Sequence, residues 1–138
     1  MKIYKLLLLP LLILVFNTGV IAQKNLEEWV SKNEKNEDLE VVYINNKSHK
    51  TKVDEKKTIV ITFKNDEDLQ TSLLEAYEKD KDNAYRLSEI RKNGVVLPDY
   101  CRFLENTTET RFLFEFKGNT TKVTMQKIFD FKEWSLGG

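Results

Sequence analysis

Residues 111–128 read RFLFEFKGNTTKVTMQKI and contain two alternating segments separated by a Gly-Asn pair. Three phenylalanines occupy every second position of the first segment: Phe112, Phe114 and Phe116. Side chains of a strand point alternately to its two faces, so these rings share one face. The pair at 118–119 predicts a turn, and residues 121–128 predict a strand that returns beside the first. The stretch therefore predicts an antiparallel pair of strands with one apolar face.

Further strands are predicted on both sides of this pair. Short runs rich in β-branched and aromatic residues, or alternating with period two, occupy residues 40–45, 58–63, 84–92 and 95–104. Asn93-Gly94 joins the last two runs and favours a type I′ hairpin turn, because both residues tolerate positive φ. Pro98 has no N–H to donate, so it predicts an edge or a bulge at that point.

Helical patterns occur twice. Asn65-Asp66-Glu67-Asp68 predicts a helix start, and the helix itself is expected over residues 66–79. Its apolar stripe consists of Leu69, Leu73, Ala76 and Tyr77. An earlier helix is expected to begin at Asn25, with Glu28 completing a capping box.

The predicted order of elements is α-β-β-α-β-β-β-β. Because most strands follow one another through tight turns, the sheet should be mostly antiparallel. The predicted fold class is α+β, with two layers in which two helices pack on one face of the sheet.

The first 22 residues have the layout of a secretory signal peptide. Lys2 and Lys5 precede an unbroken apolar run at 6–16, which is too short for a membrane-spanning helix of about 20 residues. We therefore expect residues 1–22 to be a signal peptide and residues 23–138 to be a single α+β domain. Gln23 stands where a lipoprotein would need a cysteine, so the exported product should be free in the periplasm or outside the cell.

Composition excludes several classes of function. The whole chain has 22 basic and 22 acidic residues, and removal of the leader takes away two of the basic ones. Such a balance indicates neither nucleic acid nor a membrane surface as a partner. Cys101 and His49 are the one cysteine and one histidine of the sequence. We therefore predict no metal site and no cofactor, and we expect Cys101 to be buried and inert.

Two groups of residues are candidates for binding. A lysine-rich segment contains Lys47, His49, Lys50 and Lys52, which could bind an anionic glycan or phosphate. The alternative is a solvated hairpin arm whose lysines prevent edge-to-edge strand pairing. Tyr85 and Tyr100 could line a sugar or peptide groove, or they could belong to the core. The sequence thus favours a non-enzymatic binding module for an unknown protein, peptide or glycan.

Two other functions remain open. A small hydrolase would use carboxylates such as Glu89, Glu105 or Glu115, but strand spacing does not set the separation between two carboxylates. A homo-oligomeric structural protein of the envelope is the other alternative. Three Asn-x-Ser/Thr triplets begin at Asn46, Asn106 and Asn119, and they would be glycan acceptors only in a eukaryotic secretory protein.

Several segments also carry a resemblance. They are the leader, Asn25-Leu26-Glu27, Phe63-Lys64-Asn65-Asp66, the run from Tyr77 to Tyr85, and Arg91-Lys92-Asn93-Gly94. Together they resemble a family of small exported proteins of unknown function from Bacteroides-type gut bacteria. The resemblance implies a bacterial origin and a periplasmic or cell-surface address. It brings no established catalytic residues, so no role is carried over to positions of this chain.

Overall fold

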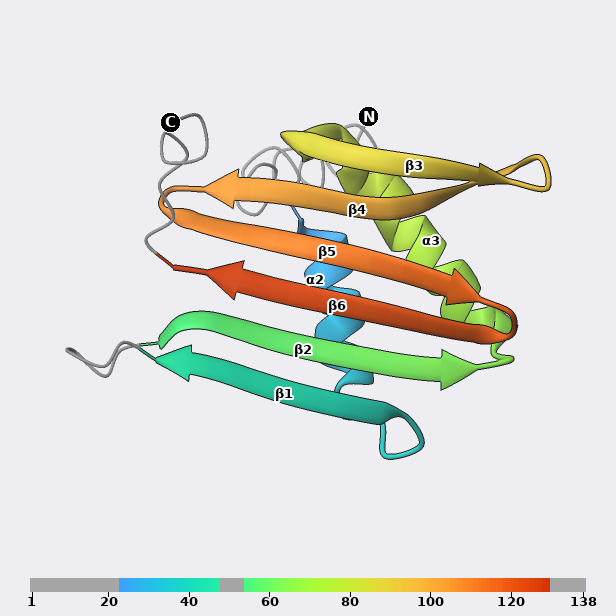
Figure 1. Ribbon diagram of the computed structural model, residues 1–138, viewed down its shortest axis with the longest axis horizontal. Helices are drawn as coiled ribbons and strands as arrows, with labels where there is room; N and C mark the ends of the chain where they lie inside the picture. The colour runs from blue at the N-terminus through green and yellow to red at the C-terminus, as the bar shows by residue number, and fades with distance from the viewer. Residues whose placement is uncertain (1–22, 48–53, 130–138) are drawn as a thin grey trace, which may run out of the picture.

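The computed structural model describes residues 23–47 and 54–129, so the predicted leader lies outside the described residues. The elements in chain order are α2 (Lys24–Asn33), β1 (Glu40–Lys47), β2 (Asp54–Lys64), α3 (Glu67–Asp80), the short 3-10 helix η1 (Lys81–Asn83), β3 (Arg86–Lys92), β4 (Val95–Glu105), β5 (Thr108–Lys117) and β6 (Thr120–Ile128) (Figure 1). The predicted α+β class and the predicted order of helices and strands are confirmed.

The strands form one six-stranded antiparallel sheet in the order β1-β2-β6-β5-β4-β3 (Figure 1). Strands β3 to β6 follow one another through turns, so each pairs with the next. The last of them, β6, then lies beside β2 and joins the meander to the β1–β2 hairpin. The sheet therefore has two outer edges, β1 and β3.

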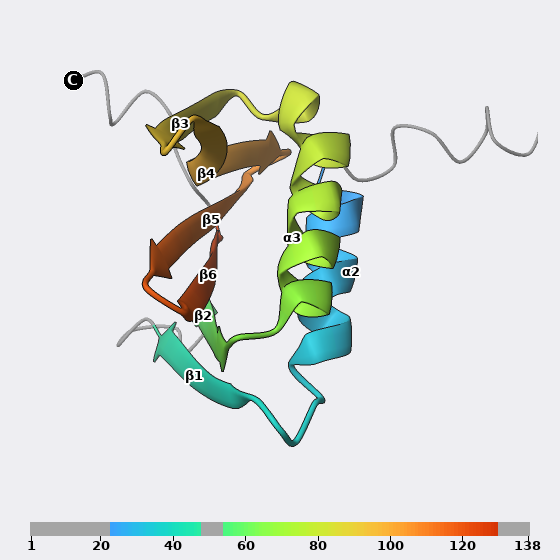
Figure 2. The same cartoon turned by 90° about the vertical axis from the view of Figure 1, so that its right-hand side faces the viewer.

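Both helices cover the same face of the sheet and pack against each other (Figure 2). The core lies between the layers, where Tyr77 of α3 meets Phe114 of β5 edge to face, with ring centroids 5.8 Å apart. Trp29 of α2 similarly approaches Phe63 of β2 at 6.1 Å. The predicted aromatic stripe of β5 thus faces the helices.

Helix α3 begins as predicted. The side chain of Asp66 accepts a hydrogen bond from the backbone N–H of Leu69 at 3.0 Å, which satisfies one of the free donors of the first turn. Glu67 and Asp68 in the first turn and Lys79 in the last complement the helix dipole. Local sequence alone is therefore sufficient to start this helix.

The predicted cap of α2 is wrong. The N-cap residue is Gln23, and its side chain makes no capping hydrogen bond. Asp80, at the end of α3, instead accepts from the backbone N–H of Leu26 at 2.7 Å and from the side-chain amide of Asn25 at 2.8 Å. Because Asp80 is 2% exposed, its carboxylate is held by these donors rather than by bulk water. Asp80, which is distant in sequence, thus accepts the hydrogen bond from the first turn of α2 that a local capping box was predicted to accept.

The turn and bulge predictions on β3 and β4 are confirmed. Asn93 and Gly94 have φ values of 52° and 78°, as a type I′ turn requires. Further along β4 the register passes from Ser88↔Tyr100 to Glu89↔Pro98, which leaves Asp99 without an opposite residue. The bulge lies at Asp99, next to Pro98. Proline has no N–H for a ladder hydrogen bond, so an interruption of the ladder costs little there.

Candidate binding site on the open face of the sheet

Three arginines lie side by side on the face of the sheet that the helices leave open. The register pairs Arg86 of β3 with Arg102 of β4, and Arg102 with Arg111 of β5. The strand neighbours of the last two point into the core and are buried: Cys101, Phe103, Thr110 and Phe112. Alternation therefore directs the arginines outward, and adjacent strands are about 4.8 Å apart, so the row spans about 10 Å.

Like charges opposite one another on neighbouring strands destabilise a sheet. Arg111 forms an ion pair with Glu109 through its Nε atom. Within residues 23–47 and 54–129, neither Arg86 nor Arg102 has an ion-pair partner. The row therefore keeps a net positive charge after the ion pair between Arg111 and Glu109 is counted. Folding alone does not require three arginines side by side.

Tyr100 extends the site along β4. The guanidinium carbon of Arg102 lies 5.2 Å from the centre of the Tyr100 ring, a cation–π contact. Across the strands, Tyr100 pairs with Leu113, whose side chain is 40% exposed. The arginine row is thus bordered on this side by a tyrosine and a leucine that share its face.

Tyr85 closes the other end of the site. Its hydroxyl donates to Oε2 of the fully buried Glu109 at 2.7 Å, and its backbone N–H donates to the carbonyl of Arg102 at 3.0 Å. Burial, followed by the hydrogen bond to Glu109, raises the pKa of Tyr85 to about 12. The phenol therefore stays protonated at neutral pH and remains a donor that fixes the Glu109 carboxylate beside Arg111.

Such a site suits an anionic ligand. The planar guanidinium group presents paired N–H donors that match a carboxylate or a sulfate, and a neighbouring aromatic face offers contact area for an apolar or sugar ring. Tyr85 and Tyr100, both candidates from the sequence, come together around Arg102. The arginines were missed, because each is an ordinary polar position of an alternating strand until the register aligns all three.

Of the predicted basic segment, the structure describes only the backbone of Lys47, which takes no part in this arrangement. His49, Lys50 and Lys52 lie outside the described residues. Lys47 ends β1, where the pairing with β2 is irregular between Asn46 and Lys47. Strands β2, β6 and β5 separate β1 from β4, so the backbone of Lys47 is far from the two tyrosines.

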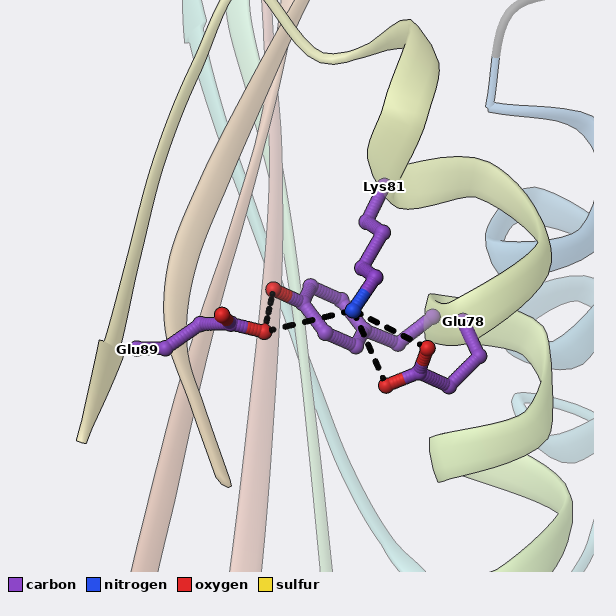
Figure 3. A network of polar contacts seen from close by, with 4 residues as sticks. Glu78, Lys81 and Glu89 are labelled. Atoms are coloured by element: carbon purple, nitrogen blue, oxygen red, sulfur yellow. Dashed lines mark hydrogen bonds and ion pairs between the residues drawn. The ribbon is translucent and has the colours of Figure 1, made fainter. Parts of the chain in front are cut away.

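Glu89 belongs to a polar network on the helix side of the sheet (Figure 3). Tyr77 of α3 donates from its hydroxyl to Oε2 of Glu89 at 2.8 Å, and Lys81 lies 3.8 Å from the same oxygen. Lys81 also pairs with Glu78 at 3.0 Å and sits 5.9 Å from the centre of the Tyr77 ring. Burial, with the Glu89 hydrogen bond and charge adding to it, raises the pKa of Tyr77 above its ordinary value. The network ties the edge strand β3 to α3.

The other two candidate carboxylates lie elsewhere. Glu115 alternates with buried Phe114 and therefore belongs to the open face, where its two oxygens lie 4.0 Å from Lys117 and 3.7 Å from Lys122. Glu105 ends β4 and lines a cavity of about 330 Å³ together with Glu27 and Lys127, which form an ion pair. Glu89, Glu105 and Glu115 are thus not brought together.

Cys101 is buried, as predicted, and burial raises the pKa of its thiol, with the charge of Asp80 adding to the shift. A thiol in that state is a poor nucleophile. Among the described residues, no group of three or more His, Cys, Asp or Glu side chains could hold a metal ion. Over the same part of the chain, no helix has the length and apolar character needed to cross a membrane.

A family model described as "Domain of unknown function (DUF5024)" matches residues 23–127. Of the elements that the structure describes, the match covers all the helices and all the strands except the final residue of β6. Among curated proteins, no similar sequence is found.

Proposed function

We propose that this chain, which belongs to the DUF5024 family, is an exported non-enzymatic domain that binds an acidic glycan on the open face of its sheet. The observation that carries the proposal is the row of Arg86, Arg102 and Arg111 on three adjacent strands. Export is inferred from the leader sequence, in which a basic start precedes a short apolar run.

The arginines supply recognition of the acidic groups. Arg102 is partly buried between its strand neighbours and is held over the Tyr100 ring, so little side-chain freedom is lost when it binds. Arg86 is exposed at the edge of the sheet and can reach a second acidic group of the same chain. A chain of uronic acids carries one carboxylate on each sugar, so Arg86 and Arg102 can bind two acidic groups of one ligand.

The aromatic border favours a glycan over a simple anion. Tyr100 and the exposed Leu113 offer an apolar surface beside the charges. The C–H groups of a sugar ring pack against the face of an aromatic ring, while the carboxylate turns to the guanidinium. An inorganic anion would contact the arginines but would make no contact with the apolar surface of Tyr100 and Leu113.

The non-enzymatic part of the proposal is supported by the acidic residue at the site. Glu109 accepts from Tyr85 and pairs with Arg111, so both of its oxygens are already occupied. A general acid or base needs a carboxyl group that can reach the substrate. Glu109 is fully buried and does not offer one.

The test is calorimetric titration with an oligogalacturonate of about five residues. We expect Arg102→Gln to weaken binding by about tenfold or more, because a charge-assisted hydrogen bond contributes about 1.5–3 kcal/mol. Arg91→Gln is the matched control: it removes the same charge from β3, and alternation places Arg91 on the opposite face from Arg86. This control should change the affinity by less than about twofold, because its charge is screened at that distance.

Equal losses in the two variants would mean non-specific attraction to positive charge and would overturn the proposed site. Equal affinity for neutral maltopentaose would show that the site does not recognise the acidic groups of the ligand. Cleavage of the oligogalacturonate during the titration would favour the hydrolase alternative instead.

A further inference from the structure

Strands β4 and β5 separate toward the β3–β4 turn. Strand β4 pairs with β3 from Val95↔Lys92 to Arg102↔Arg86, but its pairing with β5 extends only from Tyr100↔Leu113 to Glu105↔Thr108. The first part of β4, residues 95–99, therefore stays with β3 and leaves β5. Figure 1 shows the β3–β4 hairpin rising away from β5 toward its turn.

The bulge explains why the separation begins at this point. Asp99 has no opposite residue on β3, and a bulge bends its strand and increases the local twist. Pro98, the preceding residue, has no N–H with which to extend a ladder toward either neighbour. Residues 95–99, which precede Tyr100, are thus turned away from β5.

The separation leaves an unpaired edge inside the sheet. Residues 114–117 of β5 pair with β6 on one side, and within the described chain no strand pairs with them on the other. In an antiparallel strand, alternate residues direct their N–H and C=O groups to the same neighbour. Part of the backbone of 114–117 is consequently free to pair with another strand.

A cavity of about 300 Å³ lies between the separated segments. Its apolar lining residues are Ile90, Leu97, Pro98, Phe114 and Phe116. The rim carries Lys92 and Lys117, and the latter is 85% exposed at its side chain. The rim also carries Asp99 and Glu115, but Glu115 lies near both Lys117 and Lys122. With Lys122 counted, three lysines stand against the carboxylates of Asp99 and Glu115, so one positive charge remains around the cavity.

We propose that residues 114–117 of β5 bind an extended peptide by strand addition, with an apolar side chain of the peptide in the adjacent cavity and acidic residues beside the lysine rim. The unpaired backbone selects an extended polypeptide, because regularly spaced N–H and C=O groups are what another strand supplies. The apolar cavity selects one side chain, and the lysines complement acidic flanks. This site stands on backbone geometry and does not depend on the arginine row.

The experiment uses an acetylated and amidated heptapeptide of alternating threonine and leucine with aspartate at both ends. We expect saturable binding with a Kd below about 1 mM, together with slower amide exchange at 114–117. A second peptide, N-methylated at alternate residues on the edge that would face β5, cannot donate the ladder hydrogen bonds. It should bind at least about tenfold more weakly.

The variant Ile90→Asp tests the cavity, and Ile44→Asp is its matched control. Ile90 and Ile44 are exposed to similar extents, 49% and 47%, and lie on the two opposite edge strands, so the same change is tolerated at both. Ile90→Asp should weaken the peptide by about tenfold, because it removes apolar contact and repels the acidic flanks. Ile44→Asp should leave binding unchanged.

Three results would overturn the proposal: no binding at 1 mM peptide, equal binding of the N-methylated peptide, or equal effects of the two aspartate variants. Retained peptide binding in Arg102→Gln is expected, since Arg102 neither lines the cavity nor belongs to residues 114–117. Loss of oligogalacturonate binding alone would therefore count against the acidic-glycan proposal and not against strand addition.

Discussion

Asp80 connects the two helices through a single buried carboxylate. It accepts from the backbone of Leu26 and from the side chain of Asn25, so the end of α3 satisfies donors at the start of α2. A free N–H at a helix start is costly when it is buried without a partner. The residue therefore holds both the start of α2 and its position against α3.

We predict that Asp80→Ala lowers the free energy of unfolding by about 2–4 kcal/mol, because it leaves two donors without an acceptor. Urea unfolding followed by circular dichroism measures the change. The control is Asp82→Ala, an exposed position in η1, which should stay within about 0.5 kcal/mol of the original protein. Similar losses at both positions would mean that Asp80 acts through net charge and not through its hydrogen bonds.

Residue patterns predicted the local chemistry and missed the contacts made at a distance. The Asp66 cap and the positive φ of Asn93 could be read directly, because each depends on its immediate neighbours. The cap of α2 could not, because Asp80 is brought to Leu26 only by helix packing. The arginine row was missed for the same reason: only the register of β3, β4 and β5 aligns it.

Strand β3 is held by one neighbouring strand and by the polar network at Glu89. It is an edge strand, most of its side chains are exposed, and it pairs only with β4 among the described strands. The hydroxyl of Tyr77 reaches across from α3 to Glu89 and holds the strand over the core (Figure 3). A hydrogen bond to a charged acceptor contributes about 1.5–3 kcal/mol.

We predict that Tyr77→Phe speeds amide exchange in residues 86–92 by about tenfold while the exchange of β5 and β6 changes less. The ring and its contact with Phe114 remain, so only the hydrogen bond from the hydroxyl to Glu89 is removed. Tyr43→Phe is the control, because Tyr43 also donates its hydroxyl, to the carbonyl of Glu34, but from an exposed side chain on β1. Uniform acceleration over the whole sheet would show that Tyr77 supports global stability and not the edge strand.

At the scale of elements, apolar and β-branched patterns located all six strands of the described residues, and the turns separated them correctly. The boundaries were less well predicted. Strand β2 begins at Asp54, earlier than the expected start at residue 58, and β5 begins at Thr108 where the pattern indicated 111. In both cases the strand continues through polar residues because its partner strand supplies the hydrogen bonds, which a hydrophobic pattern does not reveal.

Over the whole molecule, two tyrosines couple stability to alkaline pH. The pKa of Tyr77 and that of Tyr85 are both raised in the folded protein, the latter to about 12 from an ordinary value of 10.0. Above pH 10 the unfolded chain loses these protons while the folded chain retains them. The contribution of Tyr85 to stability is therefore complete below pH 10 and is lost as the pH rises toward 12, and that of Tyr77 also begins to fall above pH 10.

We predict that the urea midpoint of the original protein falls between pH 10 and pH 12 and that Tyr85→Phe makes this fall shallower, because phenylalanine has no proton to lose. Unfolding curves recorded at intervals from pH 8 to pH 12 provide the comparison. Parallel curves for the two proteins would mean that the Tyr85–Glu109 hydrogen bond does not contribute to the pH dependence.

The pairing of β2 with β6 was the part of the architecture that the sequence left open. Tight turns predict which strands are neighbours when they follow one another, and they gave the β3 to β6 meander. No turn joins β2 to β6: α3 crosses one face of the sheet from the β2 side to the β3 side, and the β3 to β6 meander then returns to β2 (Figures 1 and 2). A contact of that kind depends on how the two layers pack, not on any local signal.

The pairing of β2 with β6 also affects the folding rate. Every other strand pairing joins consecutive elements, and such local contacts close early at small entropic cost. The β2–β6 pairing closes a loop that contains α3 and strands β3 to β5. It can therefore form only after the β1–β2 hairpin and the β3 to β6 meander are at least partly formed. We therefore expect the rate-limiting event in folding to be the docking of the β1–β2 hairpin against β6.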